Sequence, residues 1–270
     1  MDDRSLLVSH PPAWLATAIE IVQRAGTIQL QYFGQDLQVT KKGTIDLVTK
    51  VDVEVERMGR ALIAARFPDH AVLAEELENE SPKTPARPRW VFDPLDGTVN
   101  YAHGVPIFCS SLAVEVEGRP EVAAVFDPTR RELFTAERGG GARLNGAPIG
   151  VSDSTCVIDA MLVTGFPYDI HETVDEMIGL FGAMVARARA VRRLGSAALD
   201  LCYVAAGRFD GFWEERLHPW DMSAGSLLVE EAGGYLSRFD GTPFDTHGDQ
   251  IVATNGLFHD EMVAILNRQA

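Results

Sequence analysis

Apolar side chains recur at helical spacing along several segments of the chain. Between residues 12 and 33, Trp14, Ala18 and Val22 lie on one face behind two prolines, which predicts an amphipathic helix. Residues 52–67 carry a second stripe of this kind. Further helices are expected over residues 173–188, 196–206, 221–232 and 257–267.

Short apolar runs lie between these helical segments and predict buried strands. Residues 71–74 are followed by Glu75, and residues 90–92 are followed by Asp93. Runs of this length and composition are typical of strands that carry carboxylates at their C-terminal ends. Further strands are expected over residues 107–116, 122–126, 157–163 and 209–213.

The mixture of helices and strands continues through both halves of the chain. The pair Asn145-Gly146 predicts a tight hairpin turn within residues 134–149, and the rhythm of the elements changes near residue 150. We therefore expect an N-terminal α+β subdomain over residues 1–150 and a C-terminal α/β subdomain over residues 151–270. Sheets covered by helices would enclose a cleft between them.

Composition and charge exclude several classes of protein. The 270 residues include 24 Lys and Arg against 39 Asp and Glu, a net charge of −15, which argues against a nucleic-acid binder and against an anionic membrane surface as partner. The N-terminus has no basic stretch before an apolar core, and the longest uncharged stretch, residues 97–114, is too polar to span a bilayer. Three widely spaced cysteines, expected to be buried, indicate a reducing, cytoplasmic setting (Cys109, Cys156 and Cys202).

The segment Asp93-Pro-Leu-Asp96-Gly-Thr is the strongest chemical signal in the sequence. Pro94 stiffens the backbone and Gly97 permits a sharp turn, so two carboxylates three residues apart can face one point. Together with the carbonyl of Leu95, they offer the oxygen ligands that Mg²⁺ prefers. A surface turn remains the alternative, because Asp, Pro and Gly are all turn residues.

Other acidic residues stand at the ends of predicted elements. Glu75 and Glu76 follow a strand, Asp52 precedes a helix, and Asp221 follows Trp220 at a helix N-terminus. Taken singly, these positions also suit a solvated pair, a helix N-cap and a first-turn acid that satisfies the helix dipole. Taken together, they lie where open α/β sheets place their functional sites.

Four segments in the same order resemble signature segments of the inositol monophosphatase family of Mg²⁺-dependent phosphomonoesterases. The resemblance extends from about residue 12 to the C-terminus. The segments are residues 46–52 (DLVTKVD), 73–76 (LAEE), 93–98 (DPLDGT) and, together, 220–225 (WDMSAG) with 231–234 (EAGG).

The resemblance implies a layered α-β-α-β-α sandwich of the inositol monophosphatase and fructose-1,6-bisphosphatase type, with two or three Mg²⁺ ions at its site. It implies metal ligation by four carboxylates and one carbonyl, those of Glu75, Asp93, Asp96, Asp221 and Leu95. It implies catalytic roles, including activation of the attacking water, for Asp52, Thr98 and Glu75. It implies substrate contacts from Asp96, Gly97, Thr98, Gly195, Ser196, Ala197 and Glu214.

The implied activity is hydrolysis of myo-inositol 1-phosphate by direct attack of a metal-activated water, with inhibition by Li⁺. The partner would be a small phosphate monoester, and the protein would be a homodimer. Related substrates such as histidinol phosphate, fructose 1,6-bisphosphate or other sugar and nucleotide phosphates stay open. A non-enzymatic regulatory binding protein on the same fold is the second alternative.

Two other interpretations of the motifs match this sequence less closely. Haloacid-dehalogenase-like phosphatases space their paired acids two residues apart and form an aspartyl-phosphate, whereas Asp93 and Asp96 are three residues apart. The triplet Gly139-Gly140-Gly141 could suggest a nucleotide-binding loop, but Ala and Arg follow it where a P-loop requires Gly-Lys-Ser or Gly-Lys-Thr. A hairpin turn is the expected role of these glycines.

Overall fold

Helices and strands share the chain in the computed structural model, which describes residues 13–35, 39–41, 47–77 and 87–267. None of the helices in these ranges is long and apolar enough to cross a bilayer. The helices are α1 (Ala13–Tyr32), α2 (Lys50–Arg66), α3 (Thr98–Ala102), α4 (Val174–Val185), α5 (Ala197–Ala205), α6 (Pro219–Glu231) and α7 (His259–Leu266), with short 3₁₀ turns η1 (Val157–Asp159) and η2 (Ile170–Glu172). The strands are β1 (Val39–Lys41), β2 (Leu47–Thr49), β3 (Ala71–Ala74), β4 (Arg89–Asp96), β5 (Cys109–Val116), β6 (Arg119–Asp127), β7 (Glu132–Glu137), β8 (Gly141–Leu144), β9 (Ala147–Pro148), β10 (Met161–Thr164), β11 (Ala190–Arg192), β12 (Gly211–Glu215), β13 (Tyr235–Ser237) and β14 (Gln250–Thr254).

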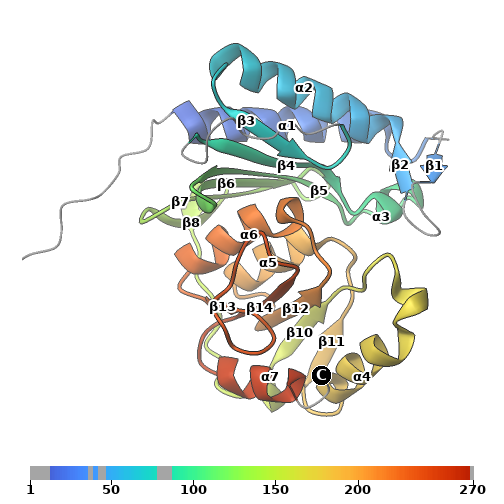
Figure 1. Cartoon of the computed structure of the whole chain (residues 1–270), viewed down its shortest axis with the longest axis vertical. Helices are drawn as coiled ribbons and strands as arrows, with labels where there is room; N and C mark the ends of the chain where they lie inside the picture. Colours follow the sequence, from blue (N-terminus) through green and yellow to red (C-terminus); the bar gives the residue numbers. More distant parts are fainter. Residues whose placement is uncertain (1–12, 36–38, 42–46, 78–86, 268–270) are drawn as a thin grey trace, which may run out of the picture.

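Five layers are stacked on one another (Figure 1). Helices α1 and α2 cover the outer face of the first sheet, α5 and α6 lie between the two sheets, and α4 and α7 cover the outer face of the second sheet. The α-β-α-β-α sandwich expected from the sequence is therefore confirmed. Such an arrangement buries both faces of each sheet, which explains the strongly apolar strands.

The two sheets differ in strand order and direction. The first has the order β3-β4-β5-β6-β7-β8-β9 and is antiparallel except for the pair β3 and β4. The second has the order β11-β10-β12-β14-β13, with β10 parallel to both β11 and β12. Strands β4 and β12 both end in acidic residues, as expected of strands that deliver carboxylates to a site.

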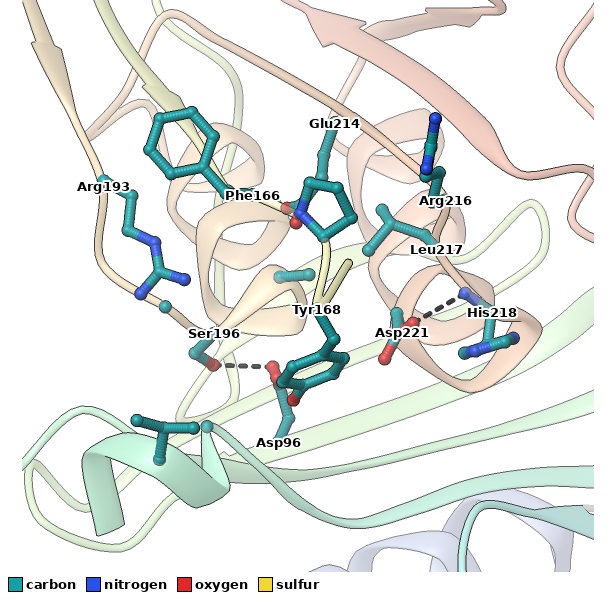
Figure 2. Close-up of a pocket in the computed structure, with 16 residues that line it drawn as sticks. Asp96, Phe166, Tyr168, Arg193, Ser196, Glu214, Arg216, Leu217, His218 and Asp221 are labelled. Atoms are coloured by element: carbon teal, nitrogen blue, oxygen red, sulfur yellow. Dashed lines mark hydrogen bonds between the residues drawn. The ribbon is translucent and has the colours of Figure 1, made fainter. Parts of the chain in front are cut away.

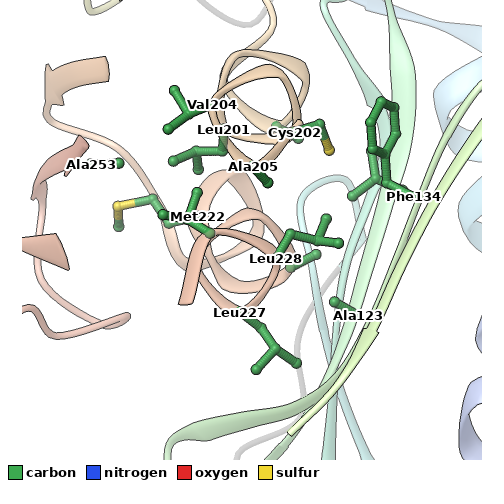
Figure 3. Packing of buried hydrophobic residues seen from close by; sticks show 14 of the residues in the cluster. Ala123, Phe134, Leu201, Cys202, Val204, Ala205, Met222, Leu227, Leu228 and Ala253 are labelled. Carbon is green, nitrogen blue, oxygen red and sulfur yellow. The ribbon is translucent and has the colours of Figure 1, made fainter. Parts of the chain in front are cut away.

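A continuous apolar core fills the space between the two sheets (Figure 3). Every residue of α5 is buried, because this helix is apolar on nearly all its faces and has neighbours on every side. Helices α5 and α6 approach closely at Gly225, where an added Cβ would lie 2.5 Å from Leu201 Cδ1. Helices α5 and α6, which belong to the second half of the chain, contact strands of both sheets. The division into subdomains at residue 150 remains a prediction.

The structure corrects three expectations about local structure. Residues 157–163 do not form one strand, because Val157–Asp159 forms a 3₁₀ turn, where Glu261 Oε2 accepts the Val157 amide at 2.9 Å, and β10 begins only after it. Helix α2 starts before Asp52, since Thr49 is its N-cap residue. Cys156 is partly exposed rather than buried. The Asn145-Gly146 turn is confirmed: it joins β8 to β9 with positive φ at both residues.

A buried histidine makes the stability of the fold depend on pH. The ring of His259 lies between the hydroxyls of Ser237 and Thr254, at 2.8 and 2.9 Å, and burial lowers its pKa. In the unfolded chain this imidazole gains its proton near pH 6.5, whereas in the folded protein it gains the proton only at lower pH. Folding therefore binds fewer protons, and stability falls as the pH drops below about 6.5.

We expect His259→Gln to flatten the loss of stability between pH 7.5 and pH 5.5. The free energy of unfolding, measured with denaturant across this range, gives the slope for each protein. His103→Gln is the matched control, because His103 is exposed at the end of α3. A slope that is the same in wild type and in His259→Gln would contradict this account.

Candidate active site

Strand β4 ends in a bulge that holds Asp93 and Asp96. Its register with β5 shifts between these residues, and Pro94, which has no amide hydrogen to offer the neighbouring strand, lies inside the irregularity. The Pro94 carbonyl accepts hydrogen bonds from Gln29 Nε2 at 2.9 Å and Ser110 Oγ at 2.8 Å. Asp93 and Asp96 are only 1% and 8% exposed, so this segment is a buried strand end rather than a surface turn.

Backbone and hydroxyl donors fix one oxygen of each of these two carboxylates. The amide of Leu95 donates to Asp93 Oδ1 at 2.9 Å. Asp96 Oδ2 accepts from Ser196 Oγ at 2.6 Å and from the amide of Ala198 at 2.8 Å (Figure 2 shows the bond from Ser196). Within the described ranges, the hydrogen bonds of Asp93 go to Oδ1 and those of Asp96 go to Oδ2, so Asp93 Oδ2 and Asp96 Oδ1 are the oxygens to offer a ligand.

Asp221 reaches the same region from the first turn of α6. Its Oδ2 accepts a hydrogen bond from the amide of His218 at 2.7 Å, and the His218 ring stacks on Trp220. Burial raises the pKa of Asp221 well above its usual value, and the charges of Asp96 and Glu75 add to this. Asp221 therefore caps the N-terminus of α6 and also belongs to the acidic cluster.

Four carboxylates act on one another across this cluster. Burial raises the pKa of Asp93 well above its usual value, and the charges of Glu75, Asp96 and Asp221 raise it further, in that order. Each group therefore makes the ionised form of Asp93 less favourable. The structure brings the four predicted carboxylate ligands of the metals into one electrostatic neighbourhood, from the residue after β3 and from β4 and α6.

The donor set fits a hard divalent cation. No three His, Cys, Asp or Glu side chains of the described residues are arranged to hold an ion as they stand, and one oxygen of Asp93 and one of Asp221 accept backbone amides. Oxygen ligands with clustered negative charge nevertheless suit Mg²⁺, since the ion would offset the mutual repulsion. The thiol of Cys109 lies 3.7 Å from Asp96 Oδ2, and burial raises its pKa well above its usual value.

Asp52 and Thr98 form a buried hydrogen-bonded pair. The Thr98 hydroxyl lies 3.0 Å from Asp52 Oδ1 and 2.9 Å from the carbonyl oxygen of Leu95. Asp52 Oδ2 also accepts from the amide and hydroxyl of Thr49, at 2.9 and 2.5 Å, which makes it part of a capping box. Burial raises the pKa of Asp52, and these hydrogen bonds oppose the shift.

Gly97 allows the chain to turn from β4 into α3. Its φ is +93°, and an added Cβ would lie 2.9 Å from the carbonyl oxygen of Ile107. Only glycine fits this position without strain. The amides of Gly97 and Thr98 are therefore held next to the acidic cluster.

A pocket opens beside the cluster and contains Glu214 (Figure 2). This side chain comes from β12 and is 8% exposed. Burial raises its pKa to about 8; the charge of Arg193 opposes the shift, and the charge of Asp96 adds to it. Gly165 leaves the space that Glu214 occupies, because an added Cβ would lie 2.1 Å from Glu214 Oε1.

The predicted segment Gly195-Ser196-Ala197 lines the same pocket. Asn100 Nδ2 donates to the carbonyl oxygen of Leu194 at 2.8 Å, which anchors the turn before α5. The Ser196 hydroxyl is committed to Asp96, so this residue orients a carboxylate of the cluster as well as lining the pocket.

Sequence reasoning missed two charged residues at this site. Arg193 lines the pocket, although the sequence shows only a run of arginines. Asp200 on α5 is 1% exposed, and neither of its carboxylate oxygens has a hydrogen-bond partner within the described ranges. Burial raises the pKa of Asp200 well above its usual value, and the charges of Glu214 and Asp96 add to this. The sequence did contain a signal for Asp200, because it is the one acidic residue in an otherwise apolar helical segment and would therefore be buried.

The glycine triplet forms a turn between β7 and β8. The two carboxylate oxygens of Glu231, which comes from α6, accept the amides of Gly139 and Gly141, both at 2.8 Å. The backbone amides that a phosphate would need therefore already donate to the carboxylate of Glu231. The hairpin role expected from the sequence is confirmed.

Comparisons with known proteins show what the whole chain is similar to. The model of the inositol monophosphatase family matches residues 12–270. The chain is 42% identical to the inositol-1-monophosphatase of Synechocystis over 92% of this chain and 87% of that protein. It is 44% identical to the Nus factor SuhB of Salmonella typhimurium over 94% of this chain and 95% of that protein. The solved inositol monophosphatase of Anabaena superposes with a TM-score of 0.86 at 39% identity, covering 95% of this chain and 96% of that one. On the fold and on these matches, the chain belongs to the inositol monophosphatase family.

Proposed function

We propose that the protein is a Mg²⁺-dependent phosphatase that hydrolyses a polyol phosphate, with myo-inositol 1-phosphate as its substrate. One observation supports this most directly. The carboxylates of Glu75, Asp93, Asp96 and Asp221 act on one another electrostatically beside a pocket that contains Glu214. The cluster suits a phosphate bound through cations, and the pocket suits the alcohol part.

The metal ions would be held by five groups of this chain. Glu75, Asp93 and the carbonyl of Leu95 would bind a first Mg²⁺, while Asp93, Asp96 and Asp221 would bind a second, with a third ion held more weakly near Glu75. When bound, Mg²⁺ supplies positive charge to the phosphate and lowers the pKa of a water molecule. A chain of net charge −15 would otherwise repel a phosphate monoester.

Asp52 and Thr98 would orient the attacking water. The Thr98 hydroxyl lies between Asp52 Oδ1 and the Leu95 carbonyl, so its oxygen can accept a hydrogen bond from water while its own proton is donated to Asp52 Oδ1. The proton that the water loses would pass through the Thr98 hydroxyl to Asp52 Oδ1 as the water oxygen bonds to phosphorus. The bond from phosphorus to the ester oxygen would break, and that oxygen would leave as the alcohol after taking up a proton from solvent. The amides of Gly97 and Thr98 would hold phosphate oxygens during this displacement.

The alcohol part of the substrate would lie against Glu214 and the turn at Gly195, Ser196 and Ala197. Glu214 is free of hydrogen bonds within the described part of the chain and faces the pocket. A carboxyl group in this position can accept a hydrogen bond from a substrate hydroxyl. Hydroxyl-rich alcohols therefore fit better than apolar ones.

A panel of phosphate monoesters tests this function. We expect hydrolysis of myo-inositol 1-phosphate with Mg²⁺, loss of activity in EDTA, and inhibition by Li⁺. Histidinol phosphate, fructose 1,6-bisphosphate and nucleotide phosphates should be turned over more slowly, as measured by kcat/KM from released phosphate. Faster hydrolysis of any of these would reassign the substrate, and trapping of a phosphorylated Asp93 would exclude direct attack by water.

A regulatory role is the second candidate, since several relatives carry the name Nus factor SuhB. Such a role and phosphatase activity can be separated. A variant that loses hydrolysis but retains any partner binding would show that the two depend on different surfaces. The family also leads us to propose a homodimer, which sedimentation or light scattering would test.

A further inference from the structure

The pocket has ends of opposite chemical character. Asp96 and Asp221 lie towards one side, where the phosphate would bind (Figure 2). Arg193 points into the pocket from the side opposite Asp221, and Glu214 points into it from β12. The end away from the metal cluster therefore combines a donor-rich guanidinium with a carboxyl group.

The backbone holds Arg193 in this position. Asn100 Nδ2 donates to the carbonyl oxygens of Leu194 at 2.8 Å and Gly195 at 3.3 Å, so the turn that follows Arg193 is anchored to α3. Gly195 has φ of +86°, and an added Cβ would lie 2.7 Å from Arg193 Nη1. The guanidinium therefore lies directly against this glycine. This contact restricts the side chain of Arg193 before the substrate binds, so less side-chain entropy is lost on binding.

Arg193 is the pocket arginine whose donors are available to a ligand. Arg216 also lines the pocket, but it forms ion pairs with Asp169 and Glu215. No ion pair or hydrogen bond of the Arg193 guanidinium is found in the described ranges. Its charge still lowers the pKa of Glu214 against the effect of burial, so it lies near that carboxyl without being bound to it.

We propose that Arg193 is a specificity-determining residue that donates hydrogen bonds to the hydroxyl groups of the substrate alcohol, beside the hydroxyl that Glu214 binds. The inference rests on the proposed function. It names the substrate class as phosphate monoesters whose alcohol carries adjacent hydroxyl groups.

Hydrogen-bond chemistry explains the pairing. Arginine has donors and no acceptor, a carboxyl group has oxygens that accept, and a hydroxyl group does both. Two adjacent hydroxyls can therefore satisfy both side chains and each other. A phosphate ester whose alcohol part has no further hydroxyl groups would cover Arg193 and Glu214 and leave their polar groups unpaired. Unpaired buried polar groups are what discriminates most strongly between substrates.

The test compares Arg193→Leu with Arg192→Leu. Both variants remove one positive charge from neighbouring, exposed positions, but Arg192 lies on β11 outside the pocket lining, and its Nη1 donates to the carbonyl oxygen of Val191. For each protein, kcat and KM are measured with Mg²⁺ on myo-inositol 1-phosphate and on p-nitrophenyl phosphate. Inhibition by free myo-inositol is measured in parallel.

We expect the ratio of kcat/KM for the inositol ester to that for the nitrophenyl ester to fall about ten- to hundredfold in Arg193→Leu, the loss expected for hydrogen bonds to a charged group. Most of the change should be in KM for the inositol ester, and inhibition by myo-inositol should weaken by a similar factor. Arg193→Lys should lose less, because it keeps the charge and some donors. Arg192→Leu should keep the wild-type ratio.

Three results would overturn the inference. They are wild-type kinetics on both esters in Arg193→Leu, an equal loss on both esters in Arg193→Leu, which would indicate a structural role, and a fall of the ratio in Arg192→Leu equal to that in Arg193→Leu. If the wild type hydrolyses p-nitrophenyl phosphate but shows no preference for polyol phosphates, the proposed substrate fails and this inference fails with it. If the wild type prefers polyol phosphates and Arg193→Leu keeps that preference, only the role of Arg193 fails.

Discussion

The Asp93→Asn variant is expected to lose Mg²⁺-dependent hydrolysis of phosphate monoesters by about a thousandfold or more. The charges of Glu75, Asp96 and Asp221 all raise the pKa of Asp93, so these carboxyl groups all lie within electrostatic reach of Asp93. We propose that it binds two ions at once, and Asn would remove the charge that serves both. Metal ions contribute several kcal/mol of charge stabilisation to such transition states, which corresponds to at least about three powers of ten in rate.

Thermal unfolding provides a second readout of the same substitution. Mg²⁺ that binds only the folded protein raises the unfolding temperature of the wild type, and this increase should be much smaller in Asp93→Asn. In EDTA the variant should be at least as stable as the wild type, because the neutral amide relieves repulsion from three acids. Asp153→Asn, an exposed acid, is the control. Full Mg²⁺-dependent activity in Asp93→Asn would end the assignment.

The Thr98→Ala variant should lower kcat about a hundredfold or more while keeping the effect of Mg²⁺ on thermal unfolding. The Thr98 hydroxyl bridges Asp52 Oδ1 and the Leu95 carbonyl, at 3.0 and 2.9 Å, and alanine removes it. A positioned proton acceptor contributes about 10²- to 10⁴-fold to such reactions. The carboxylates of the cluster are left in place, so metal binding should change little.

Thr98→Ser is the matched control, because it restores the hydroxyl and removes only a methyl group. It should recover most of the lost rate. A serine variant as slow as the alanine variant would indicate that packing at this buried position, rather than the hydroxyl, carries the effect. Wild-type kcat in Thr98→Ala would exclude the proposed role of the Asp52–Thr98 pair.

Much of the fold follows from local patterns in the sequence. The helical stripe over residues 12–33 corresponds to α1, and the Asn145-Gly146 pair forms the expected hairpin turn. These features depend on spacing and on turn chemistry within a few residues. The expected strand over residues 157–163 was partly wrong, because its first residues pack as a 3₁₀ turn whose amide is bound by Glu261 from α7.

The metal-ligand candidates were found from sequence because motifs carry them. Asp93 and Asp96 share one rigid segment, and the family resemblance adds Glu75, Asp52 and Asp221 in order. The structure brings these residues into one neighbourhood. Their roles in binding metal and activating water stay predictions until the variants are measured.

The pocket side of the site could not be read from local patterns. Arg193 and Arg192 are adjacent in the chain, and nothing in their sequence distinguishes them. Arg193 lines the pocket and Arg192 does not, because Asn100 holds the turn that follows and Gly195 has no side chain where the Arg193 guanidinium lies. Gly165 likewise matters only because Glu214 occupies the space where its side chain would be.

The sequence by itself determined the elements and the acidic segments, because these depend on short-range spacing and on contiguous motifs, and the family resemblance of those motifs added the five-layer class of the fold. The tertiary structure decided which distant groups meet. Ser196 donates to Asp96 across 100 residues of chain, and Asp221 joins the same cluster from another helix. Such contacts are set by the packing of α5 and α6 between the two sheets, and packing between distant segments leaves no periodic signal along the chain.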